Sequence, residues 1–444
     1  MPRGPGLGVL TGRPLRHWPH PGGGFEYFYG FVGGETNQWY PAIYENTSPL
    51  EPWGTPEEGY HFMADMADKA IAWTKQQKAL APDKPFFTYF APGATHAPHH
   101  VPKEWADKYR GKFDQGWDTL REETFARQKE LGVVPQDATL TARSPGIPAW
   151  EEMSEKLRPA LARQMEVYAG FLAYTDHHVG RVLDSLEDLG VLDDTLVYVI
   201  IGDNGASAEG TMKGTTNESF IINHMDHLET EDYMIEHIDD LGTPDSYNHY
   251  AIGWAHAMDT PYQWTKQVAS HWGGTRNGTI VSWPNGIAAR GEIRHQFAHV
   301  IDVAPTVLAA AGIPEPSTVH GVTQRPFEGT AMNYSFDAAD APEQHETQYF
   351  EMFGNRAIFH KAGPRSPNTR TRGSPRRTAS TPTCGSSTTW KRTGRSRTTS
   401  RTSTRTSWPT CSDCSSSRRR DSRCCPWIPG RRSGSTTNWS AGPR

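Results

Sequence analysis

The sequence predicts an α/β fold in which helices cover both faces of a mostly parallel sheet. Residues 196–201, within the stretch TLVYVIIGDNG, are large and apolar without interruption, which is typical of a central strand buried on both faces. A long helical pattern precedes them, and a second apolar run at 85–90 precedes that helix. Strand, helix and strand in this order predict a βαβ unit with a right-handed crossover.

Charge divides the chain near residue 361. Residues 361–444 hold 17 Arg, 2 Lys, 2 Asp and no Glu, a net charge of +17. The first 360 residues keep 26 basic and 48 acidic residues, a net charge of −22. We therefore expect an unstructured N-terminal segment at 1–24, a folded region at 25–360 and a basic low-complexity tail at 361–444.

All the cysteines lie in this tail, at Cys384, Cys411, Cys414, Cys424 and Cys425. The region before it therefore contains no disulfide and no thiolate metal site. The sequence has no run of 18 apolar residues, and near the start only residues 7–10 could form the apolar core of a signal peptide. We expect the chain as written to be soluble and cytoplasmic, without a membrane partner.

The folded region begins with an aromatic segment and a helix. The segment FEYFYGFVGG at 25–34 predicts a strand or a tight loop against the core. Thr55 as N-cap, Pro56 at the first helical position and Glu58 as capping-box partner predict the start of a helix. Apolar residues then repeat every three to four positions up to Leu80, so one face of this helix would pack on the sheet.

A histidine-rich loop follows the first predicted strand of the sheet. PFFTYF at 85–90 predicts this strand, and APGATHAPHHVP after it carries His96, His99 and His100. A histidine at a strand end could protonate a leaving group or hydrogen-bond to an anion, because its pKa lies near neutral pH. The alternative is that each is a surface imidazole.

The second strand of the unit ends in an acidic loop. An apolar stripe between residues 165 and 186 predicts a core helix that ends at Gly190, and the central strand follows. Asp203 and Asn204 come directly after that strand. Because ligands bind beyond the carboxyl ends of parallel strands, this carboxylate and amide would present hard oxygen donors. The alternative is a turn in which both side chains only satisfy loop amides.

Residues 209–261 are acidic, contain dispersed histidines and show no strand period, which predicts an excursion of the chain over the site. Lys266 follows, before a strand predicted at 279–283, and could place a positive charge beside an anionic substrate. The alternative is a solvated lysine. Residues 299–313 predict a short strand and an apolar helix, and residues 349–359 predict a last strand-like run.

Four motifs resemble, in chain order, the successive motifs of the sulfatase family within the alkaline phosphatase-like superfamily. They are PFFTYFAPGATHAP, TLVYVIIGDNG, KQVASHWGGTRNGTIVSWP and HVIDVAPTVLAAAGI. The aromatic segment 25–34 and the His-rich excursion resemble the large bacterial arylsulfatase branch. The resemblance covers residues 22–360 and implies a three-layer α/β fold with helices on both faces of the sheet.

The resemblance further implies a calcium-dependent hydrolase of small sulfate esters. Asp203 and Asn204 correspond to two calcium ligands. His96 corresponds to the histidine that contacts the sulfate or the leaving oxygen, and Lys266 to the lysine that binds the sulfate. A cation on Asp and Asn oxygens would polarise a sulfate oxygen, while Lys266 and His96 would offset charge as the ester S–O bond breaks.

The chain also departs from the family's pattern. Family members carry two acidic calcium ligands on the first strand and a Cys-x-Pro-x-Arg segment whose cysteine becomes the formylglycine nucleophile. Neither precedes Phe25, and no cysteine occurs before Cys384. We therefore expect an N-terminally truncated, partial sulfatase domain with an incomplete calcium shell, no nucleophile and little activity on its own.

Two other functions stay open. One is a phosphodiesterase or phosphatase of the same superfamily, for which we find no second carboxylate-rich cluster that could hold a second metal ion. The other is a non-catalytic relic that binds anions.

The tail has neither a helical nor a strand period. Its Arg-, Ser- and Thr-rich composition begins abruptly after His360 and resembles out-of-frame translation of a GC-rich gene, which we expect to be its origin. The alternative is a basic disordered arm that binds nucleic acid non-specifically. No hydrophobic pattern around its cysteines supports a zinc site.

Overall fold

Helix α4, Arg158–Asp188, is the longest element in residues 24–361, the part of the chain that this computed structural model describes. Met165 and Phe171 of the predicted apolar stripe are buried along it. Gly190, at a φ of +68°, follows the end of the helix. The predicted core helix is therefore confirmed.

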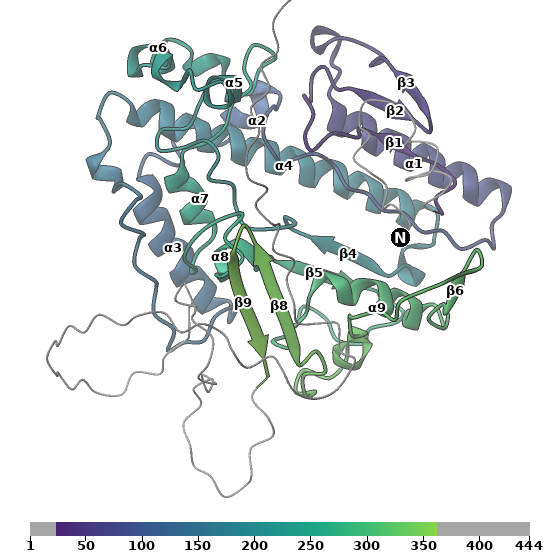
Figure 1. Ribbon diagram of the computed structural model, residues 1–444. Coiled ribbons are helices and arrows are strands. Elements are labelled where there is room, and N and C mark those ends of the chain that lie inside the picture. Colours follow the sequence, from purple (N-terminus) through teal and green to yellow (C-terminus); the bar gives the residue numbers. More distant parts are fainter. Residues whose placement is uncertain (1–23, 362–444) are drawn as a thin grey trace, which may run out of the picture. The chain divides into compact units, whose positions relative to one another are not determined.

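Helix α1, Phe62–Leu80, packs along α4 and ends where the sequence predicts (Figure 1). It starts later than predicted. The capping box at Thr55 closes a 3-10 turn instead, η2 (Pro56–Glu58), in which the Glu58 carboxylate accepts the Thr55 N–H at 2.9 Å. His61 then caps α1 by accepting a backbone N–H of the first turn. The capping signal thus marks the end of a loop, one turn before the helix.

The other helices and 3-10 turns are α2 Lys103–Asp107, α3 Gly116–Glu130, η3 Trp150–Glu152, η4 Leu192–Asp194, α5 Glu218–Ile222, η5 Asp226–Leu228, α6 Glu231–Glu236, η6 Ile238–Asp240, α7 Ile252–Met258, α8 Trp272–Thr275, η7 Val300–Asp302, α9 Val303–Ala310 and η8 Met332–Ser335. None of the helices described is long and apolar enough to cross a membrane.

A tryptophan cluster forms the core between α3, α4 and α7. The rings of Trp117, Trp150 and Trp254 lie with centroids 4.8–5.6 Å apart, and all three are buried. Trp254 belongs to α7, inside the stretch 209–261 that the sequence predicts as an excursion. That part of the stretch is core, because the helical turn at 252–258 carries large apolar side chains that α3 and α4 cover.

The strands are β1 Tyr29–Gly30, β2 Ile43–Glu45, β3 Ser48–Leu50, β4 Val197–Ile200, β5 Thr279–Ser282, β6 Thr318–Val319, β7 Val322–Thr323, β8 Thr347–Met352 and β9 Asn355–His360. Strands β1, β2 and β3 form one sheet, and β4–β5, β6–β7 and β8–β9 form separate ribbons. Every pair of named strands within residues 24–361 is antiparallel. The α/β class is confirmed, and the parallel pairing predicted for these residues is wrong.

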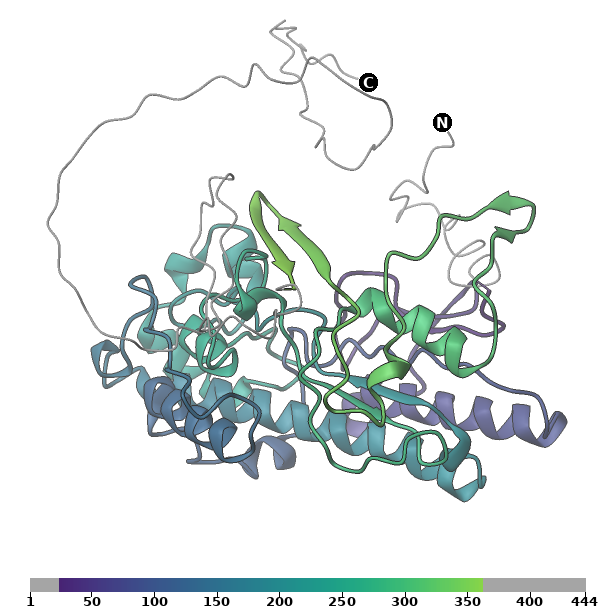
Figure 2. The same ribbon diagram turned by 90° about the horizontal axis from the view of Figure 1, so that it is seen from below.

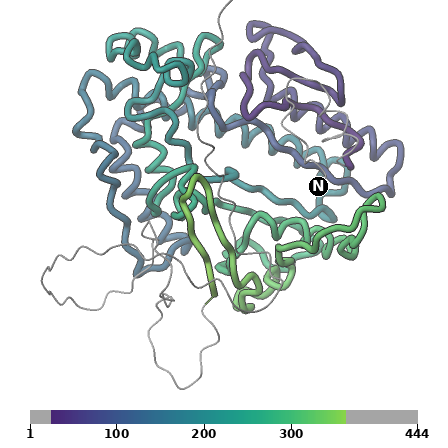
Figure 3. Tube along the Cα trace, viewed as in Figure 1, coloured from purple at the N-terminus to yellow at the C-terminus, as the bar shows by residue number. Residues whose placement is uncertain are grey.

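Strand β4 lies at the predicted central strand and pairs with β5 (Figure 3). The ribbon lies between α4 and α9 (Figures 1 and 2). Among the described residues β5 is the only strand that pairs with β4, so one edge of β4 is left without a neighbour. Ile200 and Ile201 are consequently 39% and 54% exposed, and the prediction that this strand is buried on both faces is wrong for these residues.

Residues 85–90 do not form the predicted strand. No described segment pairs with them, and Phe87 and Tyr89 are exposed. Aromatic composition favours a strand only where a partner supplies the ladder of hydrogen bonds, and here none of the described segments does. The βαβ unit predicted from this run is therefore absent from residues 24–361.

The predictions for the last part of the described chain are mixed. The sequence predicts a short strand followed by a helix at 299–313. Residues 300–302 form the turn η7 in place of the strand, and α9 follows this turn directly. The strand-like run at 349–359 forms the hairpin β8–β9. The predictions for 1–23 and for 362–444, including the cysteines and the origin of the tail, lie outside the described residues and stay predictions.

Candidate anion-binding site

The loop that follows β4 lies against the backbone of residues 264–278. Ile201 N–H donates to the Gly278 carbonyl at 2.9 Å, and Gly205 N–H donates to the Gly274 carbonyl at 3.2 Å. A Cβ on Gly205 would overlap the Gly273 carbonyl oxygen, so only glycine allows this approach. The glycine after the acidic pair thus fixes the loop to the segment that carries Lys266.

Asp203 and Asn204 lie next to each other at the start of this loop. The Asn204 amide donates a hydrogen bond to Asp203 Oδ1, and Asp203 is exposed. Neither side chain accepts a hydrogen bond from a loop amide in the described structure, in contrast to the alternative in which they only stabilise a turn. Asp203 Oδ1 therefore lies beside the Asn204 amide nitrogen, and the Asp203 side chain is open to solvent.

Lys266 is held by a constrained backbone. Its N–H donates to the Ala206 carbonyl at 3.0 Å, in the loop that follows Gly205. Trp264 and Gln267 on either side have φ values of +66° and +75°, a region that non-glycine residues rarely adopt. Residues in such conformations persist where the surroundings impose them, and they gather at functional sites.

The three histidines of the loop 91–102 have different environments. His99 and His100 are almost completely buried, so the alternative of a surface imidazole is wrong for these two. His100 Nε2 lies 2.7 Å from the Ser246 carbonyl, which anchors the loop. Burial lowers the pKa of His100 to about 4 and keeps its ring neutral. His96 is the member of the three that stays partly exposed.

His96 and Lys266, 170 residues apart in sequence, meet at this site. Lys266 Nζ lies 3.0 Å from His96 Nε2. His96 Nδ1 lies 2.9 Å from the Ala97 carbonyl, a partner that can only accept, so Nδ1 carries the proton. Nε2 then has a free lone pair and accepts a hydrogen bond from the Lys266 ammonium group. The structure thus brings together two of the predicted site residues.

Two carboxylates flank this pair. Glu209 Oε2 lies 2.9 Å from Lys266 Nζ, and Glu35 Oε2 lies 3.5 Å from His96 Nδ1. Gln267 donates to the other oxygen of Glu209 at 3.0 Å. A small pocket opens here, lined by Ala208, Glu209, Lys266 and Gln267. In the described structure the positive charge of Lys266 therefore faces the carboxylate of Glu209.

The pKa values of the acidic side chains at the site are displaced in opposite directions. Burial alone would raise the pKa of Glu209, but hydrogen bonds from Lys266 and Ser207 outweigh it, so the pKa is lowered and the group stays charged. Burial, reinforced by the charges of Glu35 and Glu209, raises the pKa of Glu218 to about 8. Glu218 is therefore mostly protonated at neutral pH and adds little negative charge.

Asp203 and Asn204 reach this cluster only through the backbone. Their side chains make no hydrogen bond or ion pair with His96 or Lys266. Calcium takes six to eight oxygen ligands, and this pair offers one carboxylate and one amide. No group of three or more His, Cys, Asp or Glu side chains within residues 24–361 is arranged to hold a metal ion. The donor types suit calcium, but the described residues do not complete its shell.

Glu209 and Glu35 are site residues that the sequence reasoning misses. Glu209 belongs to a long acidic stretch, in which no sequence pattern distinguishes it from the other Asp and Glu residues. Its distance of six residues from Asp203 on a loop tied to β4 is the signal that could have identified it. Glu35 follows the glycine pair of the aromatic segment, and no local pattern connects it with His96.

Comparisons with known proteins agree on one family. The model of the sulfatase family matches residues 11–313. An uncharacterised sulfatase of Schizosaccharomyces pombe is 30% identical over 349 residues, which cover 76% of this chain and 59% of that protein. An arylsulfatase of Klebsiella aerogenes is 27% identical over 347 residues, which cover 74% of this chain and 68% of that protein. The chain thus spans 59–68% of the length of these relatives.

Similar solved structures share less sequence. A protein of Bacteroides thetaiotaomicron, solved in work on glycosaminoglycan metabolism, is 14% identical with a TM-score of 0.42, and the match covers 76% of this chain and 54% of that one. A protein of Bacteroides fragilis described as a sulfatase is 16% identical with a TM-score of 0.41, over 76% and 55% of the two chains.

Proposed function

Because the chain belongs to the sulfatase family, we propose that the site at His96 and Lys266 serves the hydrolysis of sulfate esters. The substrate class is an aryl sulfate or a similar small ester, as the name of the Klebsiella aerogenes relative suggests. The observation that carries the proposal is the contact of Lys266 Nζ with His96 Nε2 at 3.0 Å.

In this proposal Lys266 holds the anionic sulfuryl oxygens. A lysine ammonium group is a compact charge that can donate to several oxygens at once, and substrate oxygens would take the place of Glu209 beside it. His96, after taking up a proton at Nε2 from solvent, would donate that proton to the leaving oxygen as the S–O bond breaks and the sulfur forms a bond to an attacking group that is not assigned. Its Nδ1–H bond to the Ala97 carbonyl holds the ring in place.

Asp203 and Asn204 are proposed as two calcium ligands of the active enzyme. Since the described residues do not complete the calcium shell, we derive no catalytic step through the metal. The first 360 residues contain no cysteine that could become formylglycine, so no attacking group is assigned. We propose that the chain of 444 residues binds sulfate but by itself hydrolyses aryl sulfates slowly.

Titration calorimetry of the full chain with sulfate tests the anion site. The Lys266→Met variant should bind sulfate at least about tenfold more weakly, because a charge-assisted hydrogen bond contributes roughly 1.5–3 kcal/mol. Lys84→Met is the matched control: it removes an ammonium group whose partner is the exposed Glu26, and should leave sulfate binding unchanged. Equal sulfate binding by the Lys266 variant and the unmodified chain would refute the assignment.

A second titration tests the metal ligands. Calcium should bind with a dissociation constant in the millimolar range or weaker, since roughly two of six to eight oxygens are provided. The Asp203→Asn variant should remove this binding. Micromolar calcium binding that the variant abolishes, or rapid calcium-dependent turnover of an aryl sulfate, would show that other residues of this chain complete the site.

A further inference from the structure

A second pocket is lined by Thr216 and Asn217, the two residues before Glu218. Glu218 is close enough to Lys266 and Glu209 for their charges to act on its pKa. Asn217 has an extended backbone, with φ −153° and ψ 116°, and its side chain lines the second pocket. The residues that line this pocket are all different from those that line the pocket at Lys266.

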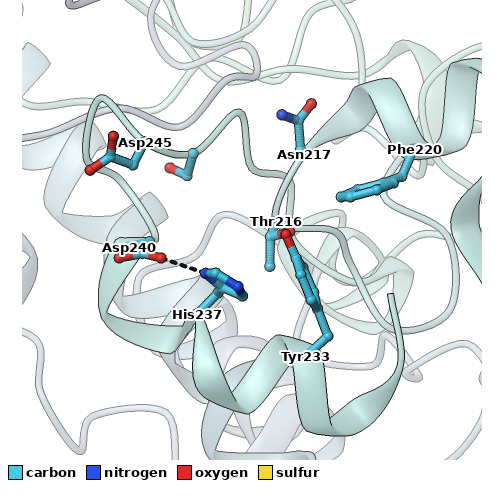
Figure 4. A pocket seen from close by; sticks show the side chains of 8 residues that line it. Thr216, Asn217, Phe220, Tyr233, His237, Asp240 and Asp245 are labelled. Atoms are coloured by element: carbon cyan, nitrogen blue, oxygen red, sulfur yellow. Dashed lines mark hydrogen bonds and ion pairs between the residues drawn. The ribbon is translucent and has the colours of Figure 1, made fainter. Parts of the chain in front are cut away.

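The second pocket is open, has a cavity volume of about 100 Å³ and combines aromatic with acidic side chains. Figure 4 shows its side chains around a common space. They are Thr216, Asn217, Phe220, Tyr233, His237, Asp240, Asp245 and Ser246. No lysine or arginine lines the pocket, so the two carboxylates give it negative character.

Aromatic rings form one wall of this pocket. Tyr233 meets Phe220 edge to face, with centroids 5.9 Å apart, and its ring lies 4.2 Å from that of His237. All three side chains are half-buried and so present part of their surface to the pocket. The face of an aromatic ring is negative and attracts a cation that approaches it.

The acidic groups Asp240 and Asp245 lie on the His237 side of the pocket, away from Phe220 (Figure 4). His237 Nδ1 lies 2.7 Å from Asp240 Oδ2, which leaves the other oxygen of Asp240 available. Asp245 forms no ion pair within the described residues. His237, Asp240 and Asp245 are not grouped as a metal site in the described part of the chain.

Buried hydrogen bonds hold the floor of the pocket in place. Thr216 donates through N–H and Oγ1 to Glu229 Oε1, at 2.7 and 2.5 Å, and Glu229 is 1% exposed. Ser246 accepts the Gly242 N–H at 3.1 Å through its hydroxyl group and contacts His100 through its carbonyl group. A pocket that is formed before the ligand arrives loses less free energy on binding.

We propose that this pocket binds a small organic ammonium ion, with the cation against Tyr233 and Phe220 and balanced by Asp240 and Asp245. An aromatic wall supplies attraction over its ring faces, and the carboxylates supply charge without the strict geometry that a metal ion requires. The pocket does not depend on the sulfate site, since its lining residues include neither His96 nor Lys266.

The test is a titration of the full chain with choline and with its uncharged carbon analogue 3,3-dimethyl-1-butanol. Choline should bind saturably in the millimolar range, and the alcohol should not. Tyr233→Leu should weaken choline binding about tenfold, because cation–π contacts of a partly desolvated ring reach roughly that factor. Tyr233→Phe keeps the ring and should keep the binding. Asp245→Asn should weaken it several-fold.

Two controls locate the binding. Tyr349→Leu removes an aromatic ring that is 55% exposed on β8 and should change nothing. Lys266→Met should also leave choline binding intact. Absence of saturation, equal binding of the alcohol, or displacement of choline by calcium would each overturn the proposal. If Tyr233→Leu does not fold, Asp245→Asn decides, and unchanged affinity in that variant refutes it.

Discussion

Glu209 is the residue that sets the state of the proposed anion site. It faces Lys266 at 2.9 Å and is held by Ser207 and Gln267, at 2.8 and 3.0 Å. In this position the Glu209 carboxylate neutralises the positive charge of Lys266, which an incoming sulfate group would need for binding. The hydrogen bonds from Lys266 and Ser207 lower the pKa of Glu209, so it remains charged throughout the neutral range. An anionic ligand must therefore displace Glu209 from Lys266.

We predict that Glu209→Gln binds sulfate more tightly than the unmodified chain, by about tenfold, because one competing charge beside Lys266 is removed. Titration calorimetry at constant ionic strength measures this change. Glu151→Gln removes a carboxylate that is 81% exposed in its pair with Arg158, and is the control for net charge. Weaker sulfate binding by Glu209→Gln would show that Glu209 positions Lys266 and does not compete with the anion.

At the residue scale, the sequence predicts those site residues that belong to ordered motifs. His96 follows an apolar run and Lys266 precedes β5, and both are recognised from their places in the chain. Glu209 and Glu35 are not recognised, because their role depends on the approach of loops that lie far apart in sequence. The burial of His99 and His100 is missed for the same reason, since a loop rich in Pro and His gives no apolar period.

At the scale of elements, helices are predicted well because their pattern is local. The stripe of α4 and the end of α1 follow from residues three and four apart. Strands depend on partners. Residues 85–90 have the composition of a strand but lie beside no described strand, while β8 and β9 form because a short turn brings them together. The direction of β5 relative to β4 could not be read from either strand alone.

The contact of Gly205 with Gly273 is an element-scale feature that can be tested. We predict that Gly205→Ala destabilises the chain by roughly 1–3 kcal/mol, because the methyl group must push apart two backbones. Gly180→Ala is the matched control. It lies within α4 with no atom within 4 Å of the added methyl group, and should stabilise the chain by about 0.5–1 kcal/mol. Urea unfolding measures both changes.

The Gly205 variant should also change the site. Because this glycine ties the Asp203 loop to the segment 264–278, pushing them apart should weaken sulfate binding even where the variant is fully folded. A Gly205→Ala chain with unchanged stability and unchanged sulfate affinity would show that the two loops adjust freely and that their contact does not position Lys266.

At the scale of the whole molecule, buried ionisable groups decide how stability depends on pH. Burial lowers the pKa of several histidines to about 3 or 4, and it raises the pKa of two acids to about 8. The histidines are His61, His100, His178, His249 and His256. The acids are Glu218 and Asp259. Both sets are neutral in the folded chain at pH 7.

The two sets act in opposite directions. Below about pH 6.5 the unfolded chain binds protons on histidines that stay neutral when folded, so stability falls as the pH falls towards 4. The two acids keep their protons in the folded chain up to about pH 8, whereas the unfolded chain releases them near pH 4, so their contribution falls as the pH rises over that interval. Below pH 6.5 the histidines outnumber the acids, so their effect on the unfolding free energy is the larger one. Between pH 6.5 and 8 only the acids change the unfolding free energy.

The unfolding free energy of the chain should therefore pass through a maximum near pH 6.5. Urea unfolding at pH 5, 6.5 and 8 measures it, with the slope of the urea dependence held as a check on two-state behaviour. Asp259→Asn removes one of the two acids and should flatten the decline between pH 6.5 and 8 and steepen the rise between pH 5 and 6.5. A stability that rises steadily from pH 5 to 8 would show that Glu218 and Asp259 are charged in the folded chain, and that their burial does not govern their protonation.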